Sequence, residues 1–589
     1  MTDVNFRRQG TKEHIDGYET VVHDVDFCVV GGGMAGLCAA VAAARHGARV
    51  LLMQDRPVLG GNASSEIRMW ICGARGPDNK ETGILEEIML DNYYRNPGLK
   101  YPIWDTVLYE KARFQPHLDL LLNCTCNDVT TEGDRIVSVK GWQMTTQTWH
   151  AVKAKLFADC SGDSVLRVCG ADYRWGREGR DEFGESLAVA QPNRQTMGSS
   201  ILIQLRGVDE HVPFIAPAWA YKFTEEDLAH RSMIPDEAEN FWWLEIGGLG
   251  DTIKDTEDNR DELLKMAYGV WDFIKNHPDG RGHRWELEWI GMLPGKRENV
   301  RYVGDHILTQ NDILAEGRFD DMVAYGGWPM DDHPSKAFHY RGEPTVFHHA
   351  PSPYGIPYRC LYSRNIANLF FAGRNISASH IALSSTRVMA TCSIMGQAVG
   401  TAAALAVKYN CSPRDVYQRH IRELQATLMD DDCYLPWHAR PVPELAQSAR
   451  LTASAGDPQP LRNGIDRSLG DADNGWWGQP GAWVEYRFAA PTHIAQARFT
   501  FDSNLRSHKR MPCSWPRQGH HVCIPGMMAR SFDIEALDDD DRWVCVKQVR
   551  DNYQRLVRVP LDMVTRAIRF VVRESWGAER VHVFAFDVR

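Results

Sequence analysis

The first part of the chain alternates apolar runs typical of strands with stretches of helical periodicity. Apolar runs lie at residues 27–30, 48–53, 120–125 and 154–159, and helical spacing occurs at 35–44, 84–89 and 107–114. Two further strands are expected around 128–130 and 135–139. The alternation of strands and helices predicts an α/β fold with a doubly wound, mostly parallel sheet.

The pattern changes completely from about Pro441 onward. Helical periodicity gives way to short alternating strands separated by Asp, Asn, Gly and Pro turns, which predicts an all-β sandwich. The expected strands cover residues 482–488, 494–501, 531–536, 543–549, 567–572 and 581–588. We therefore predict four segments: 1–165 and 366–440 as the two parts of an α/β domain, 166–365 as an inserted α+β domain, and 441–589 as the sandwich.

Composition narrows the possible classes of protein. A chain of 589 residues with 43% hydrophobic residues can form several cores, and a net charge of -11 without any dense basic run argues against nucleic-acid binding. Residues 1–26 lack the basic and apolar pattern of a secretory signal, so we expect a cytoplasmic protein. The uncharged stretch 388–407 is long enough to span a membrane, but its many small residues favour a packed core helix.

The 14 cysteines show no CxxC pair, so no metal site is predicted. Buried thiols in a reducing compartment explain most of them. Cys124 and Cys126 are compatible either with a redox pair or with alternation along a strand.

The strongest motif lies between the first apolar run and the first helix. Gly31, Gly33 and Gly36 form a GxGxxG pattern that continues through Met34 and Ala35 into the helix. The first glycine permits a tight turn, the second lets a pyrophosphate approach the backbone, and the third lets helix and strand pack closely. This βαβ unit predicts a dinucleotide site at the positive end of the helix.

The residues after the second strand distinguish between dinucleotides. An acidic residue usually binds the ribose at this position, whereas here Gln54 precedes Asp55. Both remain candidates for the ribose. The loop beyond them resembles the flavoprotein pattern that lies along the ribityl chain and flavin ring, so FAD is preferred over NAD. The cofactor candidates in this loop are Arg56, Gly61, Asn62, Ala63 and Ser64.

Two later segments add to this pattern. Residues 156–164 resemble the second flavoprotein signature, with Asp159, Gly162 and Asp163. Residues 368–377 form a strand that leads into Gly373 and Arg374, and a long helix containing Gln397 and Ala398 follows. Residues 20–430 thus resemble the FAD-dependent oxidoreductase family that carries the motifs RPxLGGN(A/S)SS and AGRNIS, within the glutathione-reductase-like and fumarate-reductase-like FAD fold. All the residues named here are then expected to bind FAD.

The resemblance also implies where the reaction takes place. The long helix should direct its positive N-terminus at the flavin pyrimidine, where it would stabilise a reduced flavin, and Arg387 stands at that end. His380 lies in the preceding loop and is the first candidate for the base that accepts a hydroxyl proton. Glu245 and His333 are the alternatives, and a structural role for His380 remains open.

Substrate contacts are expected from the inserted domain and from residues 66–71, which alternate like a strand. Arg68, Trp70, Tyr354 and Arg359 are the candidates. The insertion is rich in tryptophan and carboxylates, which favours a carbohydrate or another polyol, although each tryptophan can equally be a core residue. Residues 445–589 more loosely resemble the discoidin-like, galactose-binding-like jelly roll, with Trp476 or Trp477 as a sugar platform or a purely structural or oligomerising role as the alternative.

Together these features predict an FAD-dependent oxidoreductase that exchanges a hydride between flavin N5 and a small hydroxylated substrate, a sugar or glycoside. One alternative is a redox-neutral FAD enzyme that eliminates or epimerises a glycoside through a transient keto compound. The other is a carbohydrate-binding protein with a vestigial cofactor fold. The sequence leaves homo-oligomer formation, the electron acceptor and covalent attachment of FAD open.

Overall fold

The computed structural model describes residues 11–15, 17–507 and 522–589, which fall into two compact units. Among these residues, the first unit consists of 11–73 and 98–424, and the second of 74–97, 425–507 and 522–589. Sequence patterns assigned 74–97 to the α/β domain, whereas the structure groups this segment with the sandwich.

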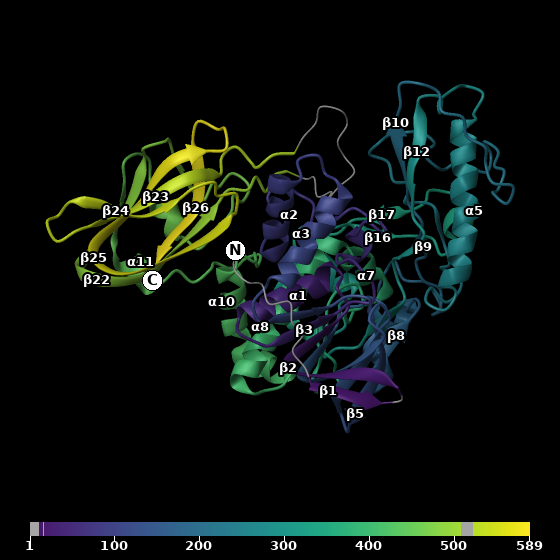
Figure 1. The fold of residues 1–589 in the computed structure, drawn as a ribbon, viewed down its shortest axis with the longest axis horizontal. Coiled ribbons are helices and arrows are strands. Elements are labelled where there is room, and N and C mark those ends of the chain that lie inside the picture. The colour runs from purple at the N-terminus through teal and green to yellow at the C-terminus, as the bar shows by residue number, and fades with distance from the viewer. Residues whose placement is uncertain (1–10, 16, 508–521) are drawn as a thin grey trace. The chain divides into compact units, whose positions relative to one another are not determined.

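A mostly parallel sheet forms the centre of the first unit (Figure 1). Its parallel strands are β4 (Leu118–Leu121), β3 (Val50–Met53), β2 (Tyr18–Val30), β7 (Thr148–Asp159) and β19 (Leu369–Phe371). The antiparallel strands β6 (Arg135–Gln143) and β5 (Cys124–Glu132) extend from β7, and β1 (Thr11–Ile15) pairs with β2. The predicted α/β sheet is confirmed.

Two helices of small residues pack closely beside this sheet. Helix α1 (Met34–Arg45) follows β2, and α8 (Met389–Tyr409) is the long helix near the end of the unit. A Cβ atom at Gly396 or Gly400 would lie 2.0 or 2.1 Å from a backbone oxygen of α1, so both glycines are required for this contact. By length and composition α8 could cross a membrane, but 94% of its apolar window is buried in the protein, as expected for a core helix.

The remaining segments of the sheet domain are helices and loops that connect its strands. The helices here are η1 (Gly61–Ala63), α3 (Tyr101–Arg113), η2 (Val165–Cys169), α7 (His380–Thr386), α9 (Pro413–Asp415) and η5 (Val416–His420). The boundary between the two units falls within α10 (Ile421–Asp430). The strand expected at 66–71 is wrong, because the chain there turns without pairing into a ladder. It is held instead by hydrogen bonds to the loop before it, such as that from the Met69 N–H to the Asn62 carbonyl.

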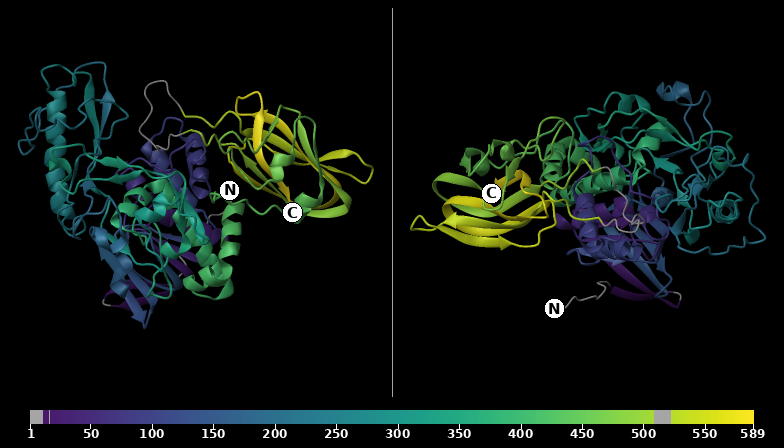
Figure 2. Two further views of the ribbon diagram at one scale, coloured as in Figure 1. Left: turned by 180° about the vertical axis from the view of Figure 1, so that it is seen from behind. Right: turned by 90° about the horizontal axis from the view of Figure 1, so that it is seen from above.

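The insertion builds a second layer from short antiparallel strands and one long helix. Helix α5 (Thr256–Lys275) lies beside β10 and β12 (Figures 1 and 2). Its apolar face packs into a core with Ile203, Leu205 and Trp243. The other elements are β8 (Tyr173–Trp175), α4 (Arg180–Phe183), β9 (Ser199–Ser200), β10 (Ile203–Gly207), β11 (Glu245–Ile246), β12 (Trp285–Ile290), β13 (Gly295–Lys296), β14 (Val300–Tyr302), α6 (Gln310–Leu314), β15 (Met322–Gly326), β16 (Met330–Asp332), η3 (Ala337–His339), β17 (Val346–His348), β18 (Tyr354–Pro357) and η4 (Tyr358–Cys360).

The second unit contains the predicted β-sandwich, built on two long bent strands. The first half of β22 (Trp483–Phe501) pairs with β20 (Arg450–Ala453) and the end of β25 (Leu556–Ser575), and its second half pairs with β26 (Val581–Val588) and the start of β25. The two halves therefore lie in different layers, around a core of Phe499, Phe532, Phe570 and Phe586. The remaining elements are β21 (Trp476–Gly478), β23 (Ala529–Leu537), β24 (Trp543–Val549), α11 (Glu444–Ser448) and η6 (Gln459–Arg462).

Residues 74–97 pack against the sandwich through one side of a helix. In α2 (Ile84–Arg95), Leu90 joins a buried cluster with Ile524 and Met528, and Tyr94 stacks on Tyr553 with ring centroids 4.0 Å apart. The apolar pattern of α2 was visible in the sequence, but its partners lie more than 400 residues further along the chain.

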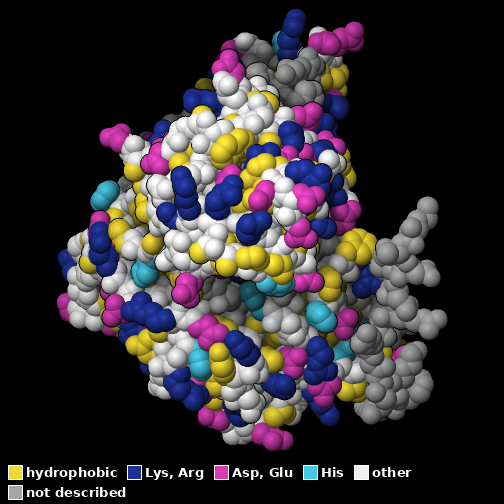
Figure 3. Space-filling view, turned by 90° about the vertical axis from the view of Figure 1, so that its left-hand side faces the viewer, with side chains coloured by type: hydrophobic (Ala, Val, Ile, Leu, Met, Phe, Trp, Pro, Cys, Tyr) yellow, Lys and Arg dark blue, Asp and Glu magenta, His cyan; other side chains and the backbone are white. Residues whose placement is uncertain are grey.

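Trp476 and Trp477 are the two residues of the sandwich expected to stack on a sugar, and the ring of each is covered by other side chains. Trp476 is 2% exposed and lies in the core. Trp477 stacks on His582, with centroids 4.0 Å apart and planes at 5°, and Arg580 lies 5.3 Å from its ring. On the face shown in Figure 3, basic and acidic side chains are interspersed among the residues described, which agrees with the absence of a basic run in the sequence.

Candidate functional site

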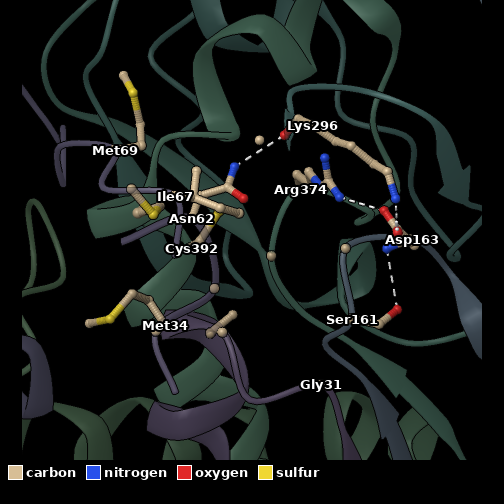
Figure 4. Close-up of a pocket in the computed structure, with 18 of the residues that line it drawn as sticks. Gly31, Met34, Asn62, Ile67, Met69, Ser161, Asp163, Lys296, Arg374 and Cys392 are labelled. Atoms are coloured by element: carbon tan, nitrogen blue, oxygen red, sulfur yellow. Dashed lines mark hydrogen bonds and ion pairs between the residues drawn. The ribbon is translucent and has the colours of Figure 1, made fainter. Parts of the chain in front are cut away.

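A cavity of about 690 Å³ lies between the edge of the parallel sheet and the insertion (Figure 4). Both walls belong to the first unit. The lining comes from segments far apart in the sequence, within residues 30–35, 53–56, 60–72, 124–126, 160–165, 200–202, 242, 293–297, 328–333, 347, 373–374 and 387–392. The cavity thus brings together all three motifs identified in the sequence.

The three motif glycines have different surroundings. Gly31 has φ +100°, and a Cβ there would lie 2.4 Å from the Ser161 backbone, while a Cβ on Gly36 would lie 1.8 Å from the Gly31 oxygen. These two glycines are required by packing, and Gly36 does not line the cavity. At Gly33, by contrast, a Cβ would have no neighbour closer than 3.9 Å. Packing does not require glycine there, so the open space is explained by a ligand that approaches the backbone.

At the end of β3, the Gln54 side chain is already engaged by the protein. Its Oε1 accepts from the Gly32 N–H at 2.7 Å, its Nε2 donates to the Val58 carbonyl at 3.1 Å, and the residue is 2% exposed. Gln54 therefore shapes the loop, which corrects the expectation that it binds the ribose directly. The neighbouring Asp55 lines the cavity with its carboxylate 59% exposed, and is the better candidate for a hydroxyl ligand.

The two acidic residues after β7 have separate roles. Asp159 is fully buried, outside the cavity wall, and accepts from the Ser161 and Leu166 N–H groups and the Tyr302 hydroxyl. It fixes the loop instead of contacting a ligand, contrary to expectation. Asp163 lines the cavity and accepts from Lys296 and Arg374, each at 2.6 Å (Figure 4). It also accepts from Asn299 at 2.6 Å. Burial raises the pKa of Asp163, but the charges of Arg374 and Lys296 lower the pKa by more than burial raises it. The pKa is therefore below its usual value, and the carboxylate stays charged.

The residues predicted to bind the cofactor fall into two groups, those that line the cavity and those that lie behind its wall. Those that line the cavity are Gly31, Gly33, Met34, Ala35, Gln54, Asp55, Arg56, Gly61, Asn62, Gly162, Asp163, Gly373 and Arg374. Those outside its wall are Gly36, Ala63, Ser64, Asp159, Gln397 and Ala398. The Ser64 hydroxyl donates to the Gly61 carbonyl at 2.7 Å, and Gln397 and Ala398 are buried within α8, so these residues stabilise the walls.

The cysteine pair on β5 also reaches the cavity. Cys124 and Cys126 both line it. Burial raises the pKa of Cys126 to about 12, so this thiol is not a thiolate at neutral pH. Of the two interpretations of Cys124 and Cys126, the structure favours alternation of side chains along β5 over a redox pair. In the part of the chain that the structure describes, no group of three or more His, Cys, Asp or Glu is arranged to hold a metal ion.

Among the catalytic candidates, His333 has a side chain in the cavity wall. Its Nδ1 lies 2.6 Å from Glu245 Oε2, its Nε2 lies 3.4 Å from Asp331 Oδ1, and its ring meets the edge of Trp242 at 5.5 Å. Glu245 lies behind His333, outside the wall, and also contacts Arg297 at 3.3 Å. Burial raises the pKa of Glu245, but Arg297 and His333 lower it to about 2. An ionised Glu245 accepts a hydrogen bond only, so Nδ1 of His333 donates to it, while Nε2 faces the Asp331 carboxylate at the longer distance of 3.4 Å.

Arg387, the residue that follows α7, reaches the same part of the cavity. Its Nη2 donates to the carbonyl and to Oδ2 of Asp331, at 3.0 and 3.1 Å. Asp331 also accepts from the Thr345 hydroxyl at 2.5 Å and the Trp328 indole at 3.3 Å. Burial raises the pKa of Asp331, but His333 and Arg387 bring it well below the usual value. Arg387, Asp331 and His333 thus form one polar cluster on the cavity wall.

His380, the first candidate for the base, lies outside the cavity wall and is 2% exposed. Its Nδ1 contacts Glu298 at 2.8 Å and its Nε2 contacts Asp332 at 3.2 Å. Burial lowers the pKa of His380, but Glu298 and Asp332 raise it to about 10. An imidazolium held between two carboxylates cannot accept a proton at neutral pH, so the structure assigns His380 to support and not to catalysis.

The raised pKa of His380 predicts a pH-dependent contribution to stability. The folded-state pKa of about 10 lies above the unfolded value near 6.5, so the stabilisation is complete below about pH 6.5 and is lost as pH rises toward 10. We expect His380→Gln to destabilise the protein, with the difference from wild type shrinking steadily between these pH values. Urea unfolding at pH 6, 8 and 10 measures this, and a difference that grows with pH would contradict it.

Three of the four substrate candidates also lie outside the cavity wall. The Arg68 guanidinium donates to Gln204 at 2.7 Å and lies over the rings of Tyr101 and Trp289. The Tyr354 hydroxyl contacts Ser385 at 2.5 Å, and Arg359 pairs with Asp321 at 2.9 and 3.0 Å. These side chains connect elements of the first unit. Trp70 does line the cavity.

Sequence reasoning did not single out several lining residues. These are Met69, Cys72, Ser200, Leu202, Leu293, Phe347, Met389 and Cys392. Most are apolar or small, and such residues give no signal that separates a cavity wall from a core. Trp242 and Trp328 belong to the tryptophan-rich insertion, and both line the cavity.

Three buried donors on the cavity wall are unsatisfied by the residues that the structure describes. They are Arg374 Nη1, Arg387 Nε and Trp70 Nε1. A buried donor without an acceptor costs about 1–3 kcal/mol. Such donors line the same cavity as the open backbone at Gly33, and together they fit a ligand that is rich in acceptor oxygens.

The parallel sheet, the glycine loop and the cavity under an inserted domain define a dinucleotide-binding protein of the Rossmann type. Residues 26–428 match the model of the family described as FAD dependent oxidoreductase. The chain belongs to this family, and it is an FAD-dependent oxidoreductase.

Solved structures with similarity to the chain cover its two parts separately. A geranylgeranyl bacteriochlorophyll reductase-like protein from Thermoplasma acidophilum is 14% identical over 70% of this chain and 84% of its own, with a TM-score of 0.29. A family 32 carbohydrate-binding module from Streptococcus pneumoniae EndoD is 17% identical over 25% of this chain and 97% of its own, with a TM-score of 0.20. A family 32 module from C. perfringens NanJ, solved with galactose, is 10% identical over 24% and 96%, with a TM-score of 0.17.

The residues of the cavity fit FAD. A diphosphate fits the open backbone of Gly33 at the N-terminus of α1, where N–H groups favour an anion. The Asp55 carboxylate is suited to a ribose hydroxyl, and the unsatisfied donors of Arg374, Arg387 and Trp70 match phosphate or ring oxygens. FAD is therefore the cofactor of this enzyme, and these residues are the ones that would hold it.

Proposed function

We propose that the enzyme oxidises a small hydroxylated substrate, a sugar or glycoside, to the corresponding carbonyl compound. The observation that carries this proposal is His333, whose Nδ1 is held by Glu245 and whose ring lies on the cavity wall beside Trp242. A base fixed in this way beside an aromatic ring suits a substrate that offers both hydroxyls and an apolar ring face.

The chain's own residues account for the proton transfer. Nε2 of His333 accepts the proton when the substrate O–H bond breaks, and the imidazolium that forms is then stabilised by the carboxylates of Glu245 and Asp331. FAD, when bound, supplies the two-electron acceptor for the hydride released as the adjacent C–H bond breaks and the C=O bond forms. Arg387 orients Asp331 and thereby the base.

The substrate site is both aromatic and charged. Trp242, Trp328 and Phe347 line it together with Arg297 and Arg387. Aromatic faces cover the apolar side of a sugar ring, and guanidinium and carboxylate groups bind its hydroxyls. This combination supports a carbohydrate over a wholly apolar substrate.

Anaerobic titration of the FAD-loaded enzyme with sugars, glycosides and hydroxy acids tests the proposal. Bleaching of the flavin by a sugar or glycoside, with one carbonyl product formed per flavin, is the expected result. Bleaching followed by recovery of colour without any acceptor would instead support redox-neutral elimination or epimerisation. If no hydroxylated compound bleaches a flavin that a chemical reductant does bleach, the proposal fails.

A further inference from the structure

Phe347 combines two properties that place it at the mouth of the cavity. It lines the cavity, and 49% of its surface is exposed. It lies in β17, which pairs with β16 in antiparallel register, with Phe347 opposite Asp331 and Val346 opposite Asp332. Directly paired side chains lie on the same face of a ladder, so Phe347 shares the cavity face with Asp331, and Val346 belongs to the other face.

Trp328 forms the second side of this mouth. Its indole N–H donates to Asp331 Oδ2 at 3.3 Å, and its carbonyl accepts from the Ser385 hydroxyl at 2.5 Å. Both bonds hold the residue in place. Its ring meets that of Phe347 edge-on, with centroids 6.2 Å apart and planes at 77°. The two rings therefore form an L-shaped aromatic corner.

This corner is next to the proposed reaction site but distinct from it. The aromatic residue beside the proposed base is Trp242, whose ring centroid lies 5.5 Å from that of His333. Asp331 connects the two positions, because it contacts His333 at 3.4 Å and the indole of Trp328, and it pairs with Phe347 across the ladder. The cavity thus has two adjacent places that can each receive a ring.

We propose that the corner of Trp328 and Phe347 binds a second ring of the substrate, so that the enzyme acts on a glycoside with a ring-shaped aglycone in preference to a free monosaccharide. This inference rests on the proposed oxidation of a sugar. It adds that the oxidised ring lies beside Trp242 and His333, while the outer ring, a second sugar or an aryl group, packs against Phe347 at the mouth.

Anaerobic reduction of the FAD-loaded enzyme by three glycosides of one sugar tests this inference. The methyl, phenyl and glucosyl glycosides differ in the outer group, and the sugar is the one that bleaches the wild-type flavin fastest. We expect the phenyl or glucosyl compound to have a kcat/KM about 10-fold above that of the methyl compound. Phe347→Ala should lower kcat/KM about 10-fold for the compound with a second ring and less for the methyl glycoside, which removes the preference, and Phe347→Trp should retain it.

Val346→Ala is the matched control, because Val346 is 47% exposed, precedes Phe347 and lies on the other face of the ladder. It should leave all three rates unchanged. Spectral titration of the flavin with the product glycosides gives the same comparison from binding alone. The inference is overturned if wild type shows no preference for a second ring, or if Phe347→Ala affects all three glycosides equally. Failure of every glycoside to bleach the wild type would instead refute the proposed oxidation.

Discussion

Gly33→Ala should produce a folded protein that binds FAD about 10- to 100-fold more weakly than wild type. Gly33 has φ −64°, which alanine adopts without strain, and its Cβ would have no protein neighbour closer than 3.9 Å. The new methyl group therefore fits the apoprotein. It projects into the space where a diphosphate must approach the backbone, so the cost falls on cofactor binding. Flavin fluorescence titration measures the dissociation constant.

Gly36→Ala is the informative comparison for this prediction. Its Cβ would lie 1.8 Å from the Gly31 oxygen, so this variant should lose stability in the absence of cofactor. The melting temperature of the Gly33→Ala apoprotein should stay within about 2 °C of wild type. Retention of normal FAD affinity by a folded Gly33→Ala variant would contradict the assignment of the diphosphate site.

His333→Asn should slow flavin reduction by substrate about 10²- to 10⁴-fold while leaving FAD bound. Asparagine can still donate to Glu245, which keeps the wall in place, but it cannot accept the hydroxyl proton. The rate constant comes from anaerobic stopped-flow mixing at saturating substrate.

His339→Asn provides the control for His333→Asn. His339 is exposed, lies six residues further along the chain and does not line the cavity, so the same substitution there should leave the rate unchanged. A His333→Asn enzyme that reduces its flavin within about threefold of the wild-type rate would rule out His333 as the base.

The cofactor part of the site could be predicted from the sequence because each of its segments carries a short motif. Gly31 and Gly33 belong to one motif and Asp163 to another, although the partners of these residues, such as Ser161 for Gly31 and Arg374 for Asp163, lie more than 100 residues away. The role of Gln54 could not be predicted in this way, because its side-chain amide binds the Gly32 N–H and the Val58 carbonyl. Its side chain type suggested a ribose ligand, but the loop uses both of its polar atoms.

The choice of catalytic base could not be made from the sequence, because it depends on tertiary partners. His380 and His333 are both buried histidines beside carboxylates. Each of the two has a carboxylate near both ring nitrogens, but His380 lies outside the cavity wall, whereas His333 lies on that wall. The partners Glu298 and Glu245 lie more than 80 residues from their histidines, so no local pattern distinguishes the two.

A crystal structure of the enzyme with bound FAD tests the central claim most directly. The account predicts the diphosphate against the backbone of Gly33, a ribose hydroxyl at Asp55 and the flavin ring in the chamber that Trp242 and His333 line. Flavin density elsewhere in the protein, or a ring separated from His333 by other side chains, would contradict it.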